Sequence, residues 1–143
     1  MKPTVSGLKI QPLSLENTPL GRRLDVFSRS QKISANDVSL QICYPNSVYA
    51  WFANHADIQW LACVNGDIQL AIFDQRRSSE SFGAIDERFV GEHNLQRIGI
   101  PQNVCFGWKT LSTAESRILM ISKNNKSVEK AFPFDTELIP YRW

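Results

Sequence analysis

The chain has 143 residues, of which 43% are hydrophobic and 21% charged, and its 16 Lys and Arg against 14 Asp and Glu leave a formal net charge of +2. This composition is typical of a globular protein, and the length predicts one domain over residues 1–143. The basic residues are scattered, so we expect no nucleic acid as a partner. No run approaches the roughly 18 apolar residues of a membrane span, and the N-terminus lacks a continuous apolar segment, so we expect no membrane partner either.

The three cysteines, Cys43, Cys63 and Cys105, are far apart and each lies in an apolar run. A free thiol in such a run behaves as a small hydrophobic side chain. An odd number of widely separated cysteines indicates buried free thiols in a reducing compartment. We therefore expect the protein to be cytoplasmic.

Alternation of apolar and polar residues with a period of two dominates the chain, and it predicts strands within 39–52, 58–74, 86–101, 100–111 and 115–123. Asn65-Gly66 suits a type I′ turn, so 58–74 is predicted to be a hairpin. A turn or two of helix is expected only near Ser127 to Ala131. Many short strands separated by turn residues, without a long helix, indicate an all-β sandwich or barrel.

Two segments carry a family resemblance: 74–83, with the sequence DQRRSSESFG, and 100–108, with the sequence IPQNVCFGW. The first matches all five fixed positions of the Asp-x-Arg-x-x-Ser-x-Ser/Thr-x-Gly loop of the dTDP-4-dehydrorhamnose 3,5-epimerase family. The second is similar to that family's Ile-Pro-x-Gly-x-x-His-Gly-Phe strand. Together with weaker matches at 64–66, 92–94 and 135–143, the resemblance extends over roughly residues 20–143. It implies a jelly-roll (cupin, RmlC-like) double-stranded β-helix or sandwich, and a homodimer.

The resemblance also implies a chemistry. Enzymes of this family remove a proton next to the 4-keto group of a nucleotide-linked 6-deoxy sugar and return one to the opposite face. The reaction needs a general base, a group that stabilises the enolate, and a general acid. In the family these groups are a His, a Lys and a Tyr.

This chain departs from the family at each of those positions. The base position falls at Trp51 or Phe52, the Lys position at Gln59, and the acid position near Met120, while the family's His-Gly pair is replaced by Phe106-Gly107. Aromatic rings, a neutral amide and a thioether cannot do the missing acid-base work at neutral pH. Because each lost group removes a factor of about 100 to 10,000 in rate, the family's usual epimerisation is expected to be negligible.

Two side chains near the lost base are candidate catalytic replacements. His55 stands beside Asp57, whose carboxylate would keep the imidazole basic, and Tyr49 could supply a proton. The alternatives are a solvated loop histidine and a tyrosine of the core or rim.

Ligand contacts are expected mainly from arginines and aromatic side chains. Arg22-Arg23 resembles the family segment whose arginine contacts the nucleotide diphosphate, and a guanidinium can hold two phosphate oxygens at once. For Arg76 an ion pair with Asp74 is the expected role, and the aromatic side chains either form core or stack on sugars and bases. The complete set of ligand-binding candidates is Arg22, Arg23, Trp51, Phe52, Gln59, Arg76, Phe106, Trp108 and Met120.

No His-x-His pattern is present, so neither a metal nor another cofactor is expected.

Three functional hypotheses follow. The first is a divergent member of the epimerase family that acts on or binds a dTDP-4-keto-6-deoxy sugar in surface carbohydrate biosynthesis, with its usual acid-base activity in doubt. The second is a non-catalytic jelly-roll protein with an interaction or structural role. The third is a related keto-sugar isomerase with a displaced base; an active protein of either kind would be an isomerase.

Overall fold

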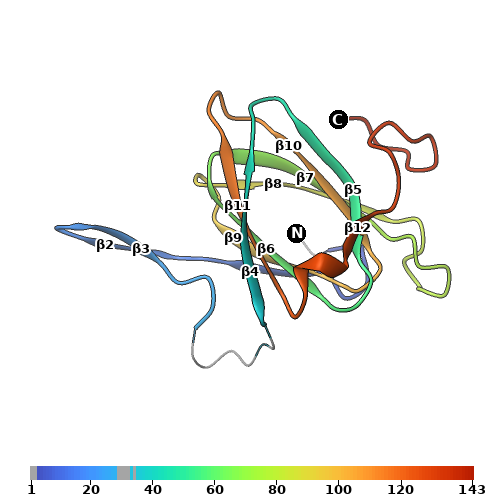
Figure 1. The fold of residues 1–143 in the computed structure, drawn as a ribbon, viewed down its shortest axis with the longest axis horizontal. Helices are drawn as coiled ribbons and strands as arrows, with labels where there is room; N and C mark the ends of the chain where they lie inside the picture. Colours follow the sequence, from blue (N-terminus) through green and yellow to red (C-terminus); the bar gives the residue numbers. More distant parts are fainter. Residues whose placement is uncertain (1–2, 29–32, 34) are drawn as a thin grey trace.

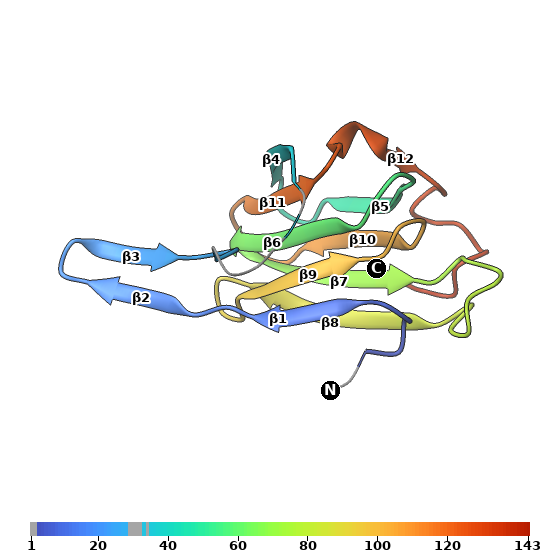
Figure 2. The same ribbon diagram turned by 90° about the horizontal axis from the view of Figure 1, so that it is seen from below.

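A computed structural model describes residues 3–28, 33 and 35–143. In this part of the chain, two five-stranded antiparallel sheets face each other, and a two-stranded arm projects away from them (Figures 1 and 2). The strand bounds are β1 Lys9–Pro12, β2 Leu15–Thr18, β3 Gly21–Leu24, β4 Asp37–Cys43, β5 Val48–Asn54, β6 Gln59–Asn65, β7 Asp67–Phe73, β8 Ile85–Gly91, β9 Gln96–Ile100, β10 Cys105–Thr110, β11 Ser116–Ser122 and β12 Val128–Lys130.

One sheet has the order β1-β9-β6-β11-β4 and the other the order β12-β5-β10-β7-β8, while β2 and β3 form the arm. From β4 to β12, every connection except β7–β8 carries the chain from one sheet to the other. This alternation is the jelly-roll arrangement, and it confirms the predicted all-β sandwich. No helix in the described ranges is long and apolar enough to cross a membrane.

The hairpin predicted over 58–74 is wrong in its pairing. Both strands are present, but β6 pairs with β9 and β11, whereas β7 pairs with β8 and β10. Of the two turn residues only Gly66 has a positive φ, 68°, and a type I′ turn needs positive values at both. The chain turns a corner here and enters the opposite sheet. Alternation of apolar residues identifies a strand, but it does not identify the neighbour with which the strand pairs.

The helical turn expected near Ser127 to Ala131 is also wrong in position. A short 3₁₀ helix covers Asn125–Ser127, and Val128–Lys130 then pairs with the edge of β5 as β12. Strand pairing with an exposed edge outweighs the weak local preference of this polar segment.

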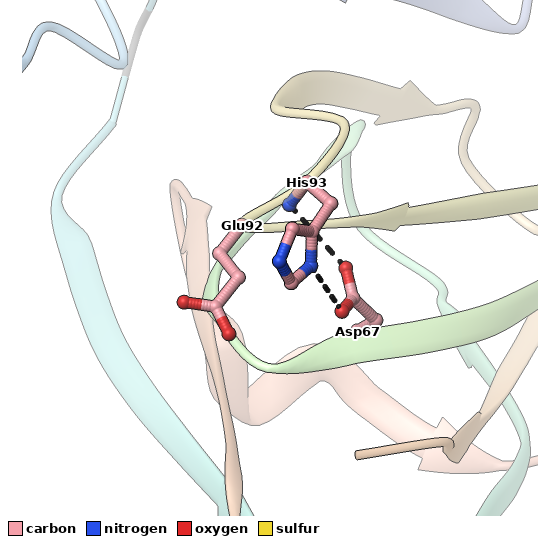
Figure 3. A group of neighbouring side chains, drawn as sticks. All are labelled: Asp67, Glu92 and His93. Atoms are coloured by element: carbon pink, nitrogen blue, oxygen red, sulfur yellow. Dashed lines mark hydrogen bonds and ion pairs between the residues drawn. The ribbon is translucent and has the colours of Figure 1, made fainter.

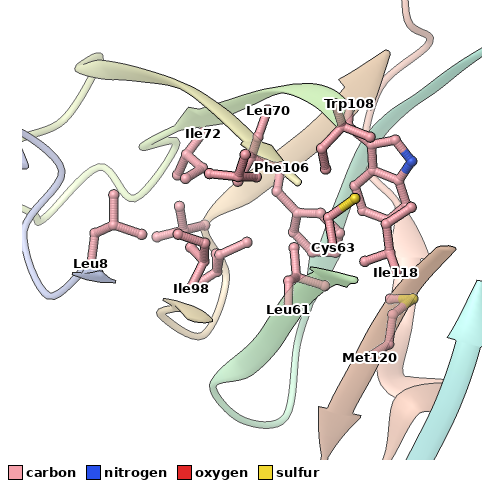
Figure 4. Packing of buried hydrophobic residues seen from close by; sticks show 14 of the residues in the cluster. Leu8, Leu61, Cys63, Leu70, Ile72, Ile98, Phe106, Trp108, Ile118 and Met120 are labelled. Carbon is pink, nitrogen blue, oxygen red and sulfur yellow. The ribbon is translucent and has the colours of Figure 1, made fainter. Parts of the chain in front are cut away.

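The main core fills the space between the two sheets. Aliphatic and aromatic side chains from both inner faces interdigitate there, and Phe106, Trp108 and Ile118 have no exposed surface (Figure 4). The three cysteines are free and buried, as predicted. Burial raises the pKa of the Cys63 and Cys105 thiols to about 12, which leaves both in the unreactive thiol form at neutral pH.

A second apolar cluster covers the outer face of the β5-β10-β7 part of the sheet. It includes Trp51, Ala71 and Cys105, and the C-terminal segment contributes Ile139 and Trp143. The strands of this sheet are therefore covered on both faces. This explains the nearly continuous burial of β10, whose residues are all buried except for Lys109.

Candidate functional site

An irregularity in β5 decides which aromatic side chains face the interior. Phe106 pairs with Phe52 and Trp108 pairs with Tyr49, so three steps along β5 oppose two along β10. This is the geometry of a β-bulge, which inserts one extra residue into one strand. Tyr49 and Phe52 consequently both pack against the inner core, whereas Trp51 belongs to the outer cluster.

The bulge separates the two candidates for the position of the lost base. Phe52 lies inside the sandwich, and Trp51 lies outside it, where its ring meets Tyr141 edge-on at 5.9 Å and Trp143 at 5.1 Å. Trp51 therefore packs under the C-terminal segment and does not reach the interior with Phe52, Phe106 and Trp108.

The inner aromatic side chains form a continuous stack. Ring centroids are 4.0 Å apart for Tyr49 and Phe52, 4.4 Å for Tyr49 and Trp108, and 6.1 Å for Phe106 and Trp108. Met120, from β11 on the facing sheet, belongs to the same core cluster. Tyr49, Phe52, Phe106, Trp108 and Met120 are thus in contact with an apolar core, and none of them lines any of five surface clefts in the described ranges.

Tyr49 is the one side chain of this stack that carries an exchangeable proton at a hydroxyl. Burial, and to a smaller extent the nearby Cys43, raises the pKa of the Tyr49 phenol to about 12. The hydroxyl therefore stays protonated at neutral pH, and it could donate a proton only to a ligand that reached the stack.

Gln59 does not face an open site. It is fully buried, and its amide joins a polar network: Asn54 donates to its Oε1 at 2.9 Å, and its Nε2 donates to the Trp60 carbonyl at 3.2 Å and to Asn125 Oδ1 at 3.3 Å. A lysine here would bury a charge among groups already paired with one another. The amide thus connects β6 to β5 and to the 3₁₀ helix.

His55 follows the end of β5, and its side chain is 47% exposed. Its Nδ1 lies 3.3 Å from Asn103 Oδ1 and its Nε2 lies 3.4 Å from Glu129 Oε2. The predicted pair between His55 and the Asp57 carboxylate is not formed. The chain turns after Asn54, and the Asn54 side chain accepts the backbone N–H of Asp57. His55 is placed at one end of the sandwich with a different carboxylate as its partner.

Arg76 has the structural role expected of it. Its Nε donates to Asp74 Oδ1 at 2.9 Å, and Ser79 and Ser81 both donate to Asp74 Oδ2. The Arg76 Nη2 also reaches the carbonyl of Ser6 at 2.7 Å, which ties the N-terminal segment to the loop. The matched residues of segment 74–83 therefore form a self-contained loop around one buried carboxylate.

Arg22 and Arg23 lie on β3 of the projecting arm, and both are exposed. Arg23 forms an exposed ion pair with Asp25 at 3.2 Å. Arg22 lines a cleft of about 340 Å³ between the root of the arm and the outer face of the sheet, together with Leu119 and Glu92.

A histidine-carboxylate pair that the sequence analysis missed lies beside this cleft. His93 Nδ1 is 2.7 Å from Asp67 Oδ2, and the ring lies between Asp67 and Glu92 (Figure 3). One donor atom from each of the three residues lies within 4.8 Å of the others. The hydrogen bond to Asp67 and its negative charge raise the pKa of His93. No local pattern reveals this pair, because tertiary structure joins residues 26 positions apart.

The closeness of these two residues depends on a tight backbone approach. Gly91 lies at the end of β8, and a Cβ atom there would be 2.2 Å from the Gly66 carbonyl oxygen and 2.5 Å from Asp67 Oδ1. Only glycine fits at this position. The backbone corner is therefore fixed by packing, and the hydrogen bond between His93 and Asp67 joins two side chains on it.

Comparison with known proteins gives a consistent result. No protein-family model matches the chain. The probable low-salt glycan biosynthesis epimerase Agl13 of Haloferax volcanii is 27% identical over 143 residues, covering 97% of this chain and 90% of that protein. The spore coat polysaccharide biosynthesis protein SpsL of Bacillus subtilis is 22% identical over 145 residues, covering 97% of this chain and 96% of that protein.

Two solved structures illustrate the fold. A dTDP sugar isomerase from Desulfovibrio desulfuricans G20 superposes with a TM-score of 0.90 at 21% identity, covering 98% of this chain and 92% of that one. A dTDP-4-dehydrorhamnose 3,5-epimerase from Elizabethkingia anophelis gives a TM-score of 0.81 at 14% identity, covering 100% and 84%. The predicted jelly-roll fold is confirmed, and in fold the chain is similar to the RmlC-like dTDP-4-dehydrorhamnose 3,5-epimerases.

Proposed function

We propose that this protein acts in the biosynthesis of a surface carbohydrate and binds a dTDP-4-keto-6-deoxy sugar without the acid-base catalysis of the epimerase family. The names of Agl13 and SpsL, which refer to glycan and spore coat polysaccharide biosynthesis, support the biological setting. The dTDP sugar named for the Desulfovibrio isomerase supports the ligand class. We also propose that residues 1–143 work as one domain and that the protein is cytoplasmic; the buried free thiols support a reducing compartment.

The observation that carries the loss of catalysis is the chemical character of three interior positions. Phe52 is the interior one of the two candidates for the base position; Gln59 stands at the position of the enolate-stabilising group, and Met120 stands near that of the acid. Phe52 is partly buried and packs against the apolar core, Met120 is buried in it, and Gln59 is held by the Asn54 and Asn125 amides. Proton abstraction from carbon needs a basic atom within hydrogen-bond reach of the substrate, which these side chains do not supply.

The test uses proton NMR in D₂O with dTDP-4-keto-6-deoxyglucose and the purified protein. We expect saturation transfer from the protein to the nucleotide, without exchange of the sugar protons next to the keto group beyond the rate measured in a protein-free sample. Protein-dependent exchange that disappears in His55→Ala would show that a displaced base works, as in the keto-sugar isomerase hypothesis. Exchange of that kind would overturn the proposal.

Absence of both exchange and saturation transfer would favour the second candidate, a non-catalytic interaction protein. The observation in its favour is an apolar row along β4, where Val38, Leu40 and Ile42 are 67%, 48% and 45% exposed. Among the described residues, β4 is an edge strand that pairs only with β11, so in this part of the chain one side of its backbone has no strand partner.

The occupant of this edge that we propose is a second copy of the chain, in a homodimer. An antiparallel pair of β4 strands would be self-complementary, as a two-fold axis requires, and it would bring the two apolar rows together. The arm supports the same assembly, because an isolated two-stranded hairpin is at best marginally stable in water and gains stability from a packing partner.

A further inference from the structure

A cleft opens between the two sheets along one side of the sandwich, where the edge strands β1 and β8 face each other. Its volume is about 560 Å³, and it is lined by Pro3, Leu8, Ile10, Pro12, Arg88, Asn94 and Gln96. β1 and β8 end their respective sheets, so no further strand of the described residues closes this side (Figure 2). The size is in the range of small-molecule sites.

Arg88 faces into the sandwich, and this orientation is unusual for a charged residue. It lies opposite Leu70 in the β7–β8 ladder, between the pairs Ile72–Asp86 and Ile68–Val90, whose apolar members belong to the inner core. Only 16% of its side chain is exposed. A buried charge is normally paired and hydrogen-bonded, because desolvation disfavours it.

The hydrogen bonds of Arg88 do not meet that requirement. Its Nη2 is buried without a hydrogen-bond partner among the described residues, and its Nη1 reaches only the neighbouring Glu87 carbonyl, at 3.5 Å. The nearest carboxylate, Asp86, is 3.7 Å away. This long ion pair is shared, since the Asp86 carboxylate also accepts the backbone N–H groups of Thr4 and Val5 at 2.8 to 3.1 Å. The guanidinium is thus held loosely, and Arg88 is one of the residues that line the cleft.

Hydrogen-bond acceptors lie across the same cleft. Gln96 is on the inner face of β9 opposite Pro12, and its Oε1 is likewise buried without a partner in the described ranges. Asn94 uses its Nδ2 to donate to the Phe89 carbonyl at 2.8 Å, which leaves its Oδ1 as an acceptor. The cleft therefore combines one cationic fork, two amide oxygens and an apolar floor made by Leu8 and Ile10.

We propose that this cleft is a binding site for a small sugar that carries an oxyanion, either a monosaccharide phosphate or a sugar acid. The planar guanidinium of Arg88 would take two oxygens of the phosphate or carboxylate. Hydroxyl groups of the sugar would donate to Gln96 and Asn94, and its C–H faces would lie on the aliphatic floor. The site is separate from the interior aromatic stack, and the inference is independent of the proposed function.

The experiment measures binding by isothermal titration calorimetry, and thermal unfolding, with four probes: glucose 1-phosphate, glucuronate, glucose and inorganic phosphate. We expect at least one of the two charged sugars to bind with a Kd below about 10 mM, and glucose without the anion to bind at least about tenfold more weakly. Inorganic phosphate alone should bind more weakly than glucose 1-phosphate. Binding of phosphate as tight as that of either sugar would overturn the assignment to a sugar ligand.

Arg88→Gln should weaken binding of the charged sugar by about tenfold or more, because a charge-assisted hydrogen bond pair is lost. Gln96→Glu, a second variant of almost unchanged size, should do the same by placing a negative charge beside the anion. Arg77→Gln removes an equal charge from an exposed loop position and should leave the Kd unchanged, within about twofold.

Thermal unfolding without ligand separates a binding role from a structural one. If Arg88 serves a ligand, Arg88→Gln should keep or raise the Tm, since it removes an unpaired buried donor, and it should abolish the rise in Tm that the charged sugar gives. A Tm lowered by Arg88→Gln together with unchanged affinity in Gln96→Glu would mean that Arg88 only holds the N-terminal segment through Asp86. Failure of both charged sugars to bind the unmodified protein would also overturn the proposal.

Discussion

Phe52 and Phe106 lie directly opposite each other in the antiparallel ladder between β5 and β10, and both pack into the core between the two sheets. These are the two strand positions at which the epimerase resemblance leads one to expect histidines. Because the two residues pair, the replacement of both expected histidines by phenylalanine affects the same part of the interior. With a phenyl ring on each strand, the interior gains stacking and apolar packing where a proton-transfer site would need polar groups and space.

Phe106→Ala should lower the free energy of unfolding by about 3–5 kcal/mol, because the ring is fully buried and its removal leaves a cavity. Urea unfolding followed by tryptophan fluorescence measures the change. Phe89→Ala is the matched control, since Phe89 is 56% exposed and its truncation should change stability by less than about 0.5 kcal/mol. Equal losses in both variants would contradict the packed interior described for Phe106.

Asp74 should make stability fall in acid. Burial by itself would raise the pKa of its carboxyl, but the hydrogen bonds from Arg76, Ser81 and Ser79 together hold it well below its usual range. A depressed folded-state pKa gives stability that is present above the unfolded value, near pH 4, and is lost as the pH falls below it. Stability measured by urea unfolding should therefore decline from about pH 4 downward.

Asp74→Asn should lower stability at neutral pH by about 3–5 kcal/mol, because it leaves the Arg76 charge without its partner, and it should flatten the acid decline. Asp135→Asn, at an exposed position, is the control. It should leave both the stability at neutral pH and the decline of stability in acid unchanged. An acid decline of unchanged size in Asp74→Asn would assign the pH dependence to other groups.

The pairing of His93 with Asp67 should be visible in an NMR titration of the two histidines. Asp67→Asn should lower the pKa of His93, because the variant removes the hydrogen-bonded negative charge that raises it. Since the folded-state pKa is raised, the pair stabilises the fold below about pH 6.5 and this contribution is lost as the pH rises through the folded value. The His55 signal provides the internal reference, and an unmoved His93 titration in Asp67→Asn would rule out the contact.

The β4 edge should control self-association. Leu40→Glu places a charge in the apolar row, so it should shift the protein from dimer to monomer and raise the dimer Kd by at least about tenfold, as measured by size-exclusion chromatography with light scattering. Leu138→Glu introduces the same charge at a leucine that is 72% exposed on the C-terminal segment, and it should not change the mass. A dimer that withstands Leu40→Glu would place the interface elsewhere.

Local sequence patterns were sufficient to locate most strands. Alternation located β4 to β11, which fall within or close to the predicted ranges, but it predicted none of the short strands β1, β2 and β3. It failed at Asn65-Gly66, where the turn signal is genuine but the strands on either side enter different sheets. It also failed at β12, a three-residue strand that exists because β5 offers an edge. Pairing partners are chosen by the whole sandwich, so a window of neighbouring residues does not contain them.

The candidate site shows the same division. The residues that replace a base, a lysine and an acid were identified from the chain alone, because their chemistry depends on residue type. The arrangement of these residues could not be identified from the chain alone. The bulge in β5 shifts the alternation of inward and outward side chains by one residue, so that Phe52 faces inward and Trp51 outward. The pairing of His55 with Glu129, and that of His93 with Asp67, join segments far apart in the sequence.

The sequence by itself determined the strand-rich character of this protein, the burial of its cysteines and the absence of the family's proton-transfer groups, since these follow from residue types and their local period. Only the tertiary structure decided which strands pair, which of Trp51 and Phe52 reaches the interior, and that Arg88 faces a cleft between two sheet edges without a full set of acceptors. The physical reason is that burial and hydrogen bonding are properties of the packed whole. A side chain acquires its partners from strands that the chain reaches only after many residues.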